Sequence, residues 1–254
     1  MRWAGATVVV TGASRGIGRA VVTAALERGA RVGAVSRSPL SMPPVAWWAA
    51  DVGDRAEVES ALAALAEELG PVDILVANAG IGAYGAFVDA EIGAIERLVQ
   101  VNVLGTVYPI KAVLPGMVER GRGHIVIVSS VAGRFGAPFE AVYSATKFAQ
   151  VGLAEALSVE VSSSGVGVSV VDPAVVDTAF FEARGHAFDR PFPRAMPATR
   201  VADAVISAVE RDRLETFVPR AFGAAVAVRH LVPRLYAWGT RRTFRRELGA
   251  TAPR

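Results

Sequence analysis

Two side chains four residues apart, Tyr143 and Lys147, have the clearest chemical use in this sequence. In a helix such residues share a face, so both would point the same way. A free phenol has a pKa of about 10, and an ammonium at ~4 Å would lower that pKa by up to roughly three units. Tyr143 could then exchange a proton with a carbonyl or alcohol oxygen near neutral pH, while Ser130 supplies a second hydrogen bond to that oxygen. Taken alone, the spacing is more typical of an ordinary buried tyrosine and a surface lysine.

The segments that would position these side chains alternate between strand and helix patterns. Strand patterns cover residues 7–10, 31–35, 45–50, 72–77, 123–129, 166–171 and 215–218. Helix patterns end near residue 28 and cover residues 54–69, 91–119, 141–164 and 199–211. Alternation of this kind predicts an α/β fold, a doubly wound parallel sheet of the Rossmann type. We expect one domain at residues 1–219, followed by a C-terminal extension at residues 220–254.

Prolines predict two irregularities in this fold. Pro39, Pro43 and Pro44 leave little room for a helix between the second and third strands, so that connection is expected to be short. Pro109 and Pro115 lie inside the pattern for the helix at residues 91–119 and are expected to bend or break it.

A glycine-rich turn joins the first strand to the first helix and reads TGASRGIG at residues 11–18. Glycines allow backbone N–H groups to approach a pyrophosphate, and the helix dipole favours its negative charge. The spacing differs from the G-x-G-x-x-G of most dinucleotide folds. The candidate pyrophosphate-binding residues are Gly12, Ser14, Arg15, Gly16, Ile17 and Gly18.

The end of the second strand predicts the choice of cofactor. In such folds an acid at this place holds a ribose 2′-hydroxyl, whereas an arginine holds a 2′-phosphate. Here the strand is followed by Ser36 and Arg37, with no acid. Arg37, with Ser36 donating a hydrogen bond and Arg15 adding charge, therefore predicts NADP(H) in preference to NAD(H). The alternative is that Arg37 is an ordinary solvated side chain.

Composition limits the class of protein. The chain has 254 residues, 52% of them hydrophobic, and contains no cysteine, which excludes disulfides and fits a reducing compartment. We expect a cytoplasmic protein without a signal peptide. The three histidines, His124, His186 and His230, are too scattered for a metal site and are interpreted as structural or surface residues.

Positive charge is concentrated near the C-terminus. Residues 216–246 contain seven arginines and no acid, whereas 20 basic and 24 acidic residues elsewhere give a net charge of −4. Within this segment, Val228, Leu231, Val232, Leu235 and Trp238 fall roughly on one helical face, which Pro233 interrupts. The segment could lie on an anionic membrane, cover an oligomer partner or pack on its own domain. No nucleic-acid recognition motif accompanies the charge.

In sum, the chain resembles the classical short-chain dehydrogenase/reductase family from about residue 6 to residue 218. It carries TGASRGIG (11–18), ANAG (77–80), VNVLG (101–105), SSVAG (129–133) and YSATK (143–147). Each motif alone is modest, but all five in order are very specific. The family's usual Pro-Gly after the sixth strand is Pro173-Ala174 here.

This resemblance implies roles for individual residues. Tyr143 would be the general acid/base, Lys147 would lower its pKa and hold the nicotinamide ribose, and Ser130 would orient the substrate carbonyl. Asn102 would sustain a water-linked proton relay through Lys147. Further cofactor contacts implied by the resemblance are Asp51 and Val52 at the adenine ring, Asn78, Ala79 and Gly80 beside the adenosine, and Pro173, Val176 and Thr178 near the nicotinamide.

The predicted function is that of an NADP(H)-dependent oxidoreductase acting on a carbonyl or secondary alcohol. Residues 178–200 read as a substrate-covering segment, and an apolar pocket is suggested by Phe135, Phe139, Phe180, Phe181 and Phe188. We expect a homo-oligomer, a dimer or tetramer, with possible peripheral membrane contact. One alternative is a non-catalytic nucleotide-sensing module of the same fold, and another is a peripheral membrane protein whose tail carries the function.

Overall fold

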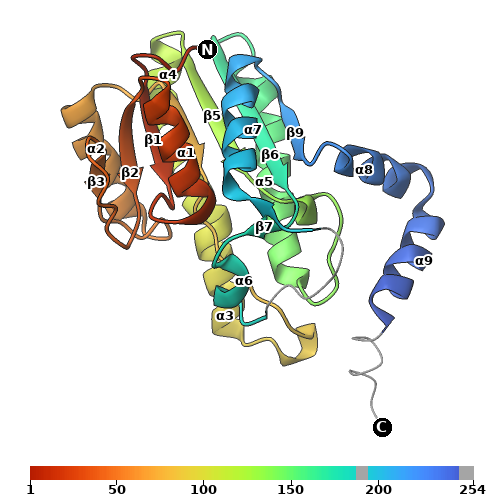
Figure 1. The fold of residues 1–254 in the computed structure, drawn as a ribbon. Coiled ribbons are helices and arrows are strands. Elements are labelled where there is room, and N and C mark those ends of the chain that lie inside the picture. Colours follow the sequence, from red (N-terminus) through yellow and green to blue (C-terminus); the bar gives the residue numbers. More distant parts are fainter. Residues whose placement is uncertain (187–193, 246–254) are drawn as a thin grey trace.

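A seven-stranded parallel sheet forms the centre of the protein (Figure 1), in a computed structural model that describes residues 1–186 and 194–245. The strand order is β3-β2-β1-β4-β5-β6-β9, and every neighbouring pair is parallel. The strands are β1 (Thr7–Thr11), β2 (Arg31–Val35), β3 (Ala46–Trp48), β4 (Ile74–Ala77), β5 (Gly123–Val128), β6 (Val166–Pro173) and β9 (Glu215–Val218). The predicted doubly wound sheet is confirmed.

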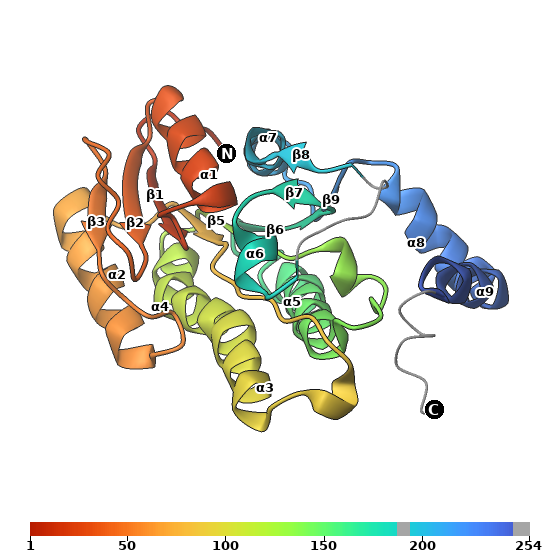
Figure 2. The same cartoon turned by 60° about the horizontal axis from the view of Figure 1, so that its bottom comes forward.

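Helices cover both faces of the sheet (Figure 2). On one face lie α1 (Gly16–Glu27) and α7 (Ala198–Glu210), and on the other lie α2 (Arg55–Leu69), α4 (Gly105–Glu119) and α5 (Ala141–Glu160). The alternation of side chains along β1 shows why the strands are apolar throughout. Val8 and Val10 join the core under α1 and α7, whereas Val9 joins the core under α2, α4 and α5.

The connection between β2 and β3 contains no helix, as the prolines predicted. Instead, the indole N–H of Trp47 donates to Ser36 Oγ at 3.0 Å, and Ser36 Oγ donates to the carbonyl of Ser38 at 2.8 Å. These bonds hold the segment against the carboxyl end of β2. β3 is three residues long and therefore shorter than the strand predicted at residues 45–50.

Pro109 and Pro115 were expected to bend or break the long helical segment, and the helix is not broken at either of them. Pro109 and Pro115 both lie inside α4. The irregularity lies upstream, where α3 (Ile92–Val99) continues into a π-helical turn at Gln100–Leu104 before α4 begins. This wide turn contains Asn102. By length and composition alone, the helical segment Ile92–Glu119 could also cross a membrane, and 44% of its most apolar window is buried inside the protein.

Smaller elements complete one end of the sheet. They are β7 (Val176–Asp177), α6 (Phe180–Ala183), β8 (Met196–Pro197), and the 3-10 turns at Phe87–Asp89 and Val131–Gly133. The chain then leaves the sheet through α8 (Phe222–Leu231) and α9 (Pro233–Thr243), which extend to one side of the molecule (Figure 1). We call these two helices the C-terminal arm. Pro233 separates them, as predicted, and neither helix contains a buried residue.

Candidate active site

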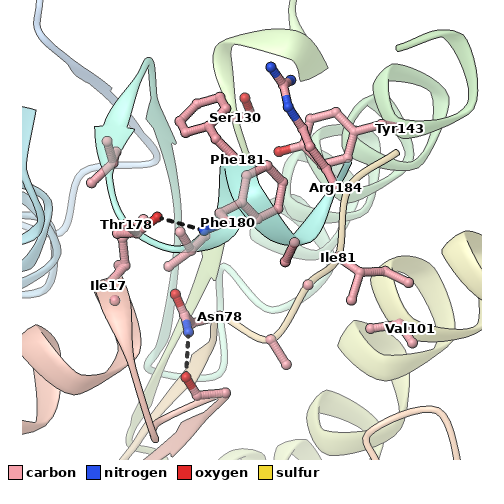
Figure 3. A pocket seen from close by; sticks show the side chains of 18 of the residues that line it. Ile17, Asn78, Ile81, Val101, Ser130, Tyr143, Thr178, Phe180, Phe181 and Arg184 are labelled. Carbon is pink, nitrogen blue, oxygen red and sulfur yellow. Dashed lines mark hydrogen bonds between the residues drawn. The ribbon is translucent and has the colours of Figure 1, made fainter. Parts of the chain in front are cut away.

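A cavity of about 610 Å³ opens along the carboxyl ends of the strands. Except for Gly18 and Asn102, all the site residues predicted from the sequence line it: Gly12, Ser14, Arg15, Gly16, Ile17, Arg37, Asp51, Val52, Asn78, Ala79, Gly80, Ser130, Tyr143, Lys147, Pro173, Val176 and Thr178. Figure 3 shows Ser130 and Tyr143 gathered on one side of the cavity, and Ile17 and Asn78 on the other. Parallel strands that end at one edge bring these distant segments together.

The glycine-rich turn is held against the end of β4 by Asn78. Its side-chain Nδ2 donates to the carbonyl of Thr11 at 3.0 Å, while its backbone N–H donates to Thr11 Oγ1 at 3.0 Å. A Cβ on Gly12 would lie 2.8 Å from Ala79 Cα, and one on Gly18 would lie 2.3 Å from the carbonyl oxygen of Gly12. Gly18 therefore serves the close packing of helix against turn behind the cavity wall.

The start of α1 fits an anion. Arg15 is its N-cap and makes no side-chain capping bond, and the first turn contains no acid. The backbone N–H groups at the start of a helix have no partner within the helix, and here that start lines the cavity at Gly16 and Ile17. The residues present thus fit the pyrophosphate of a dinucleotide.

Asp51 marks the far end of the cavity and forms an ion pair with Arg97. Burial raises the pKa of Asp51, but the N–H of Gly53 and the charges of Arg97 and Arg37 outweigh this and hold the pKa below its usual value. Arg97 lines the cavity and was not predicted. No local sequence pattern marks Arg97, because it lies on α3, far from Asp51 in the sequence.

Arg37 and Arg15 both line the cavity with exposed side chains. The expected hydrogen bond from Ser36 to a phosphate is not available in this arrangement, because the Ser36 hydroxyl proton goes to the carbonyl of Ser38 at 2.8 Å. That part of the prediction is wrong, and the two arginines remain as the candidates for a 2′-phosphate.

Tyr143 and Ser130 are buried at the inner end of the cavity. Ser130 Oγ accepts the N–H of Ala132 at 3.1 Å and donates to the carbonyl of Pro173 at 3.4 Å. Burial and the charge of Glu140 raise the pKa of Tyr143 far above its usual value, against the opposing effects of a hydrogen bond with Ser130 and the charge of Arg184. The phenol is therefore protonated at neutral pH.

Lys147 does not lower that pKa, so this prediction is wrong in the structure. Its Nζ lies 5.7 Å from the centroid of the Tyr143 ring and donates instead to Gln150 Oε1 at 2.9 Å and to the carbonyl of Val128 at 3.2 Å. Burial lowers the pKa of Lys147 to about 8, although the charge of Asp172 opposes this.

Gln150 links Lys147 to Asn102 and was missed by the sequence analysis. Its Nε2 donates to the backbone carbonyl of Asn102 at 2.8 Å and to Thr106 Oγ1 at 2.7 Å. All four residues are buried. The signal was present, since Gln150 lies seven residues after Tyr143 and three after Lys147, on the same helical face.

Asn102 holds the wall of the cavity from behind. Its Oδ1 accepts the N–H of Ile81 at 2.8 Å, and its Nδ2 donates to the carbonyl of Ile81 at 2.9 Å and to Thr146 Oγ1 at 3.0 Å. The structure thus gives Asn102 a positioning role. Its backbone carbonyl reaches Lys147 through Gln150, where the sequence predicted a link through water.

The substrate-side wall is aromatic, as predicted for Phe135, Phe180 and Phe181, which line the cavity. Phe139 does not line the cavity; it packs on Tyr84, with 5.7 Å between ring centroids. Phe188 lies outside the described residues, as do Arg246 and the rest of the tail.

The same wall contains polar residues that were not predicted. Arg184 is buried, ion-pairs with Glu140, and lies over the rings of Phe181 and Tyr84 at 4.5 and 5.0 Å. His186, interpreted from the sequence as structural or surface, lines the cavity and stacks on Tyr84 at 4.1 Å. These contacts join segments with no shared motif, so no local signal could have found them.

His124 is a structural residue, as predicted. It is buried in β5, and its Nε2 lies 2.8 Å from Ser169 Oγ. Burial lowers its pKa to about 4, so the ring is neutral. Within residues 1–186 and 194–245, no group of three or more acidic or histidine side chains could hold a metal ion.

Comparisons with known proteins agree with this site. Residues 6–187 match the model of the short chain dehydrogenase family. Over 193 residues the chain is 40% identical to the 3-ketodihydrosphingosine reductase of Bos taurus, an alignment covering 70% of this chain and 58% of that protein. The chain thus spans little more than half the length of that relative.

Two solved structures have the same fold. A short chain dehydrogenase/reductase from Burkholderia phymatum in complex with NAD gives a TM-score of 0.83 at 25% identity, covering 92% of this chain and 96% of the other. A short chain dehydrogenase from Burkholderia cenocepacia in complex with NADP gives a TM-score of 0.81 at 26% identity, covering 92% of this chain and 97% of the other.

Proposed function

This chain belongs to the short-chain dehydrogenase family, and on that premise we propose that it is an NADP(H)-dependent oxidoreductase acting on a carbonyl or secondary alcohol. One observation carries the proposal. A single cavity has an uncapped helix N-terminus with two arginines at one end and the hydroxyls of Ser130 and Tyr143 at the other. It therefore combines a dinucleotide-binding end with a proton-transferring end.

Tyr143 is the proton donor in the direction of carbonyl reduction. The phenol is protonated at neutral pH and lies with Ser130 at the inner end of the cavity, so it can donate to a carbonyl oxygen as the carbonyl carbon gains a hydride. The nicotinamide cofactor supplies that hydride or accepts it in the reverse direction. Ser130 orients the same oxygen through its hydroxyl, and Lys147 holds the nicotinamide ribose from the same helical face as Tyr143.

Arg37 and Arg15 support the preference for NADP(H). Both are exposed at the cavity surface, where a guanidinium can make bidentate, charge-assisted bonds to a phosphate. Asp51, a carboxylate on which the charge of Arg37 acts, forms an ion pair with Arg97. The relatives bind either NAD or NADP, so the choice rests on these side chains.

The substrate we propose is a predominantly apolar ketone or its alcohol. Support comes from the aromatic wall formed by Phe135, Phe180 and Phe181, and from similarity to a 3-ketodihydrosphingosine reductase. We also propose a homo-oligomer in the cytoplasm. The exposed apolar side chains of Phe87, Val88 and Ile92 support an interface between subunits, and light scattering on the purified protein would test it.

The test is a panel of ketones and secondary alcohols, followed at the nicotinamide absorbance with NADPH and NADH. We expect turnover of apolar ketones and a higher kcat/KM with NADPH. Binding of NADPH with no turnover across the panel would contradict the proposal and favour the alternative, a nucleotide-sensing module. Equal efficiency with NADH would contradict only the cofactor preference.

A further inference from the structure

The C-terminal arm exposes an apolar stripe that its own domain does not cover. Of the described residues in α8 and α9, none is buried. The stripe consists of Val228, Leu231, Val232, Leu235 and Trp238, with Leu231 82% exposed and Trp238 61% exposed. Figures 1 and 2 both show the arm extending away from the sheet. Exposed apolar side chains grouped in this way mark an interaction surface.

The stripe is flanked by positive charge. Arg234, Arg241 and Arg242 are three or four residues from Trp238, which makes them its neighbours on the surface of α9. The Arg242 guanidinium lies 5.7 Å from the Trp238 ring. All three arginines are exposed, and residues 216–246 contain no acid that could neutralise them.

Attachment of the arm to the domain uses a different set of side chains. Arg229 donates to the carbonyl of Arg134 and lies over the Phe148 ring at 5.1 Å. The ring centroids of Phe222 and Tyr236 each lie 6.2 Å from the ring centroid of Phe135. These side chains therefore attach the arm to the domain, while the apolar stripe and its flanking arginines remain exposed and could contact a partner.

We propose that this stripe docks on an anionic lipid bilayer. Apolar side chains would enter the boundary between headgroups and acyl chains, while the flanking arginines meet the lipid phosphates. A second copy of the chain fits less well. In a symmetric dimer a patch meets its own copy, so both arms would bring arginines and no acid to the interface, and the like charges would repel.

The end of the arm also lies at the cavity, so docking of the arm would bring the cavity close to the membrane. Phe244, one residue beyond α9, lines the cavity, and its ring lies 6.4 Å from that of Phe139. Phe135, which contacts both helices of the arm, lines the cavity as well. An arm on the membrane would hold the cavity beside the bilayer, so that an apolar ketone could enter from the lipid. This step rests on the proposed function.

The docking is tested by co-sedimentation of the full chain with vesicles of phosphatidylcholine, with and without phosphatidylglycerol. We expect binding only with the anionic lipid, weakened by added salt. Arg234→Glu/Arg241→Glu should weaken binding by about 25-fold or more, since each arginine near an anionic surface contributes about fivefold. Leu235→Ala/Trp238→Ala should weaken it by about tenfold.

Matched controls lie outside the arm. Arg2→Glu/Arg211→Glu reverses two exposed arginines, and Val118→Ala/Val159→Ala truncates two exposed apolar side chains. Both should bind vesicles like the unmodified chain. Losses as large as those of the arm variants would overturn the proposal, as would equal binding to neutral vesicles. So would arm variants that dissociate an oligomer and leave vesicle binding intact.

Activity separates this inference from the proposed function. With a water-soluble ketone, the turnover rate of Arg234→Glu/Arg241→Glu should equal that of the unmodified chain. With an apolar ketone dissolved in anionic vesicles, the turnover rate of the variant should be lower than that of the unmodified chain, because the variant does not dock. Vesicle binding without turnover of any ketone would refute the proposed function and leave the docking standing. Turnover without vesicle binding would refute the docking alone.

Discussion

The inner end of the cavity and its outer walls are built in different ways. Around Lys147 at the inner end, buried side chains on α5 bond at 2.7–3.2 Å to one another, to a side chain on α4, and to backbone carbonyls of β5 and the π-helical turn. On the outer walls, Arg37 is exposed just after a strand. Arg184, directly after α6, contacts Glu140 through an ion pair, the carbonyl of His186 through a hydrogen bond, and two aromatic rings. Under the proposed function, the reacting groups therefore lie on strands and long helices, whereas the residues proposed to recognise cofactor and substrate lie on loops and short segments. Substitutions at the inner end should therefore change rates, and those on the outer walls should change preferences.

Tyr143→Phe should have the largest effect. It removes only the transferable proton, so turnover is expected to fall by about 10²–10⁴-fold while NADPH binding stays nearly intact. Steady-state kinetics and fluorescence titration with NADPH measure the two quantities. More than about a tenth of the original activity would show that Tyr143 is not the acid.

Arg37→Ala should act on preference alone. A charge-assisted bidentate contact is worth about 1.5–3 kcal/mol, so kcat/KM with NADPH should fall by roughly ten- to hundredfold and that with NADH should change little. Arg19→Ala, which removes another exposed arginine outside the cavity, is the control. An equal fall with both cofactors would mean that Arg37 does not choose between them.

Substitutions of Gln150 should shift the pKa of Lys147 and therefore the pH dependence of activity. If protonated Lys147 is the active form, activity falls as pH rises through its pKa of about 8. Gln150→Leu removes an acceptor from the ammonium, which lowers that pKa and moves the fall in activity to lower pH. Gln150→Glu adds a negative charge, which raises the pKa and moves the fall to higher pH.

Both Gln150 variants also lose the bond to Asn102, so a purely structural role would move the two pH profiles in the same direction. Shifts in opposite directions identify Gln150 as a positioning residue for Lys147. The measurement is kcat against pH for both variants and the unmodified chain.

Arg184→Met should have the smallest effect on rate. The substitution keeps an apolar side chain against Phe181 but removes the ion pair with Glu140, so KM for the ketone should change by about three- to tenfold with kcat within about twofold. Glu140→Gln breaks the same ion pair from the other side and is its counterpart. A kcat that falls as far as in Tyr143→Phe would place Arg184 with the inner end instead.

Much of this site follows from local sequence. Strands read as apolar runs because both faces of the sheet are covered, and the residues after each strand had to meet at one edge. That reasoning located Ser130 and the glycine-rich turn, helical spacing located Tyr143 and Lys147, and the structure brings all of them into one cavity. The sequence likewise predicted the missing helix after β2 and the break at Pro233.

Other features depended on contacts between distant segments. The sequence predicted that Ser36 donates a hydrogen bond to a phosphate, but in the folded chain its hydroxyl donates to the carbonyl of Ser38. The sequence also predicted that Lys147 lowers the pKa of Tyr143, but the buried ammonium of Lys147 donates to Gln150. Prolines were expected to bend or break a helix that they leave unbroken, and the irregular hydrogen bonding lies upstream, in the π-helical turn that contains Asn102. Local patterns determine which residues end each strand, whereas hydrogen-bond partners and pKa values depend on the desolvation and neighbours that only the folded chain provides.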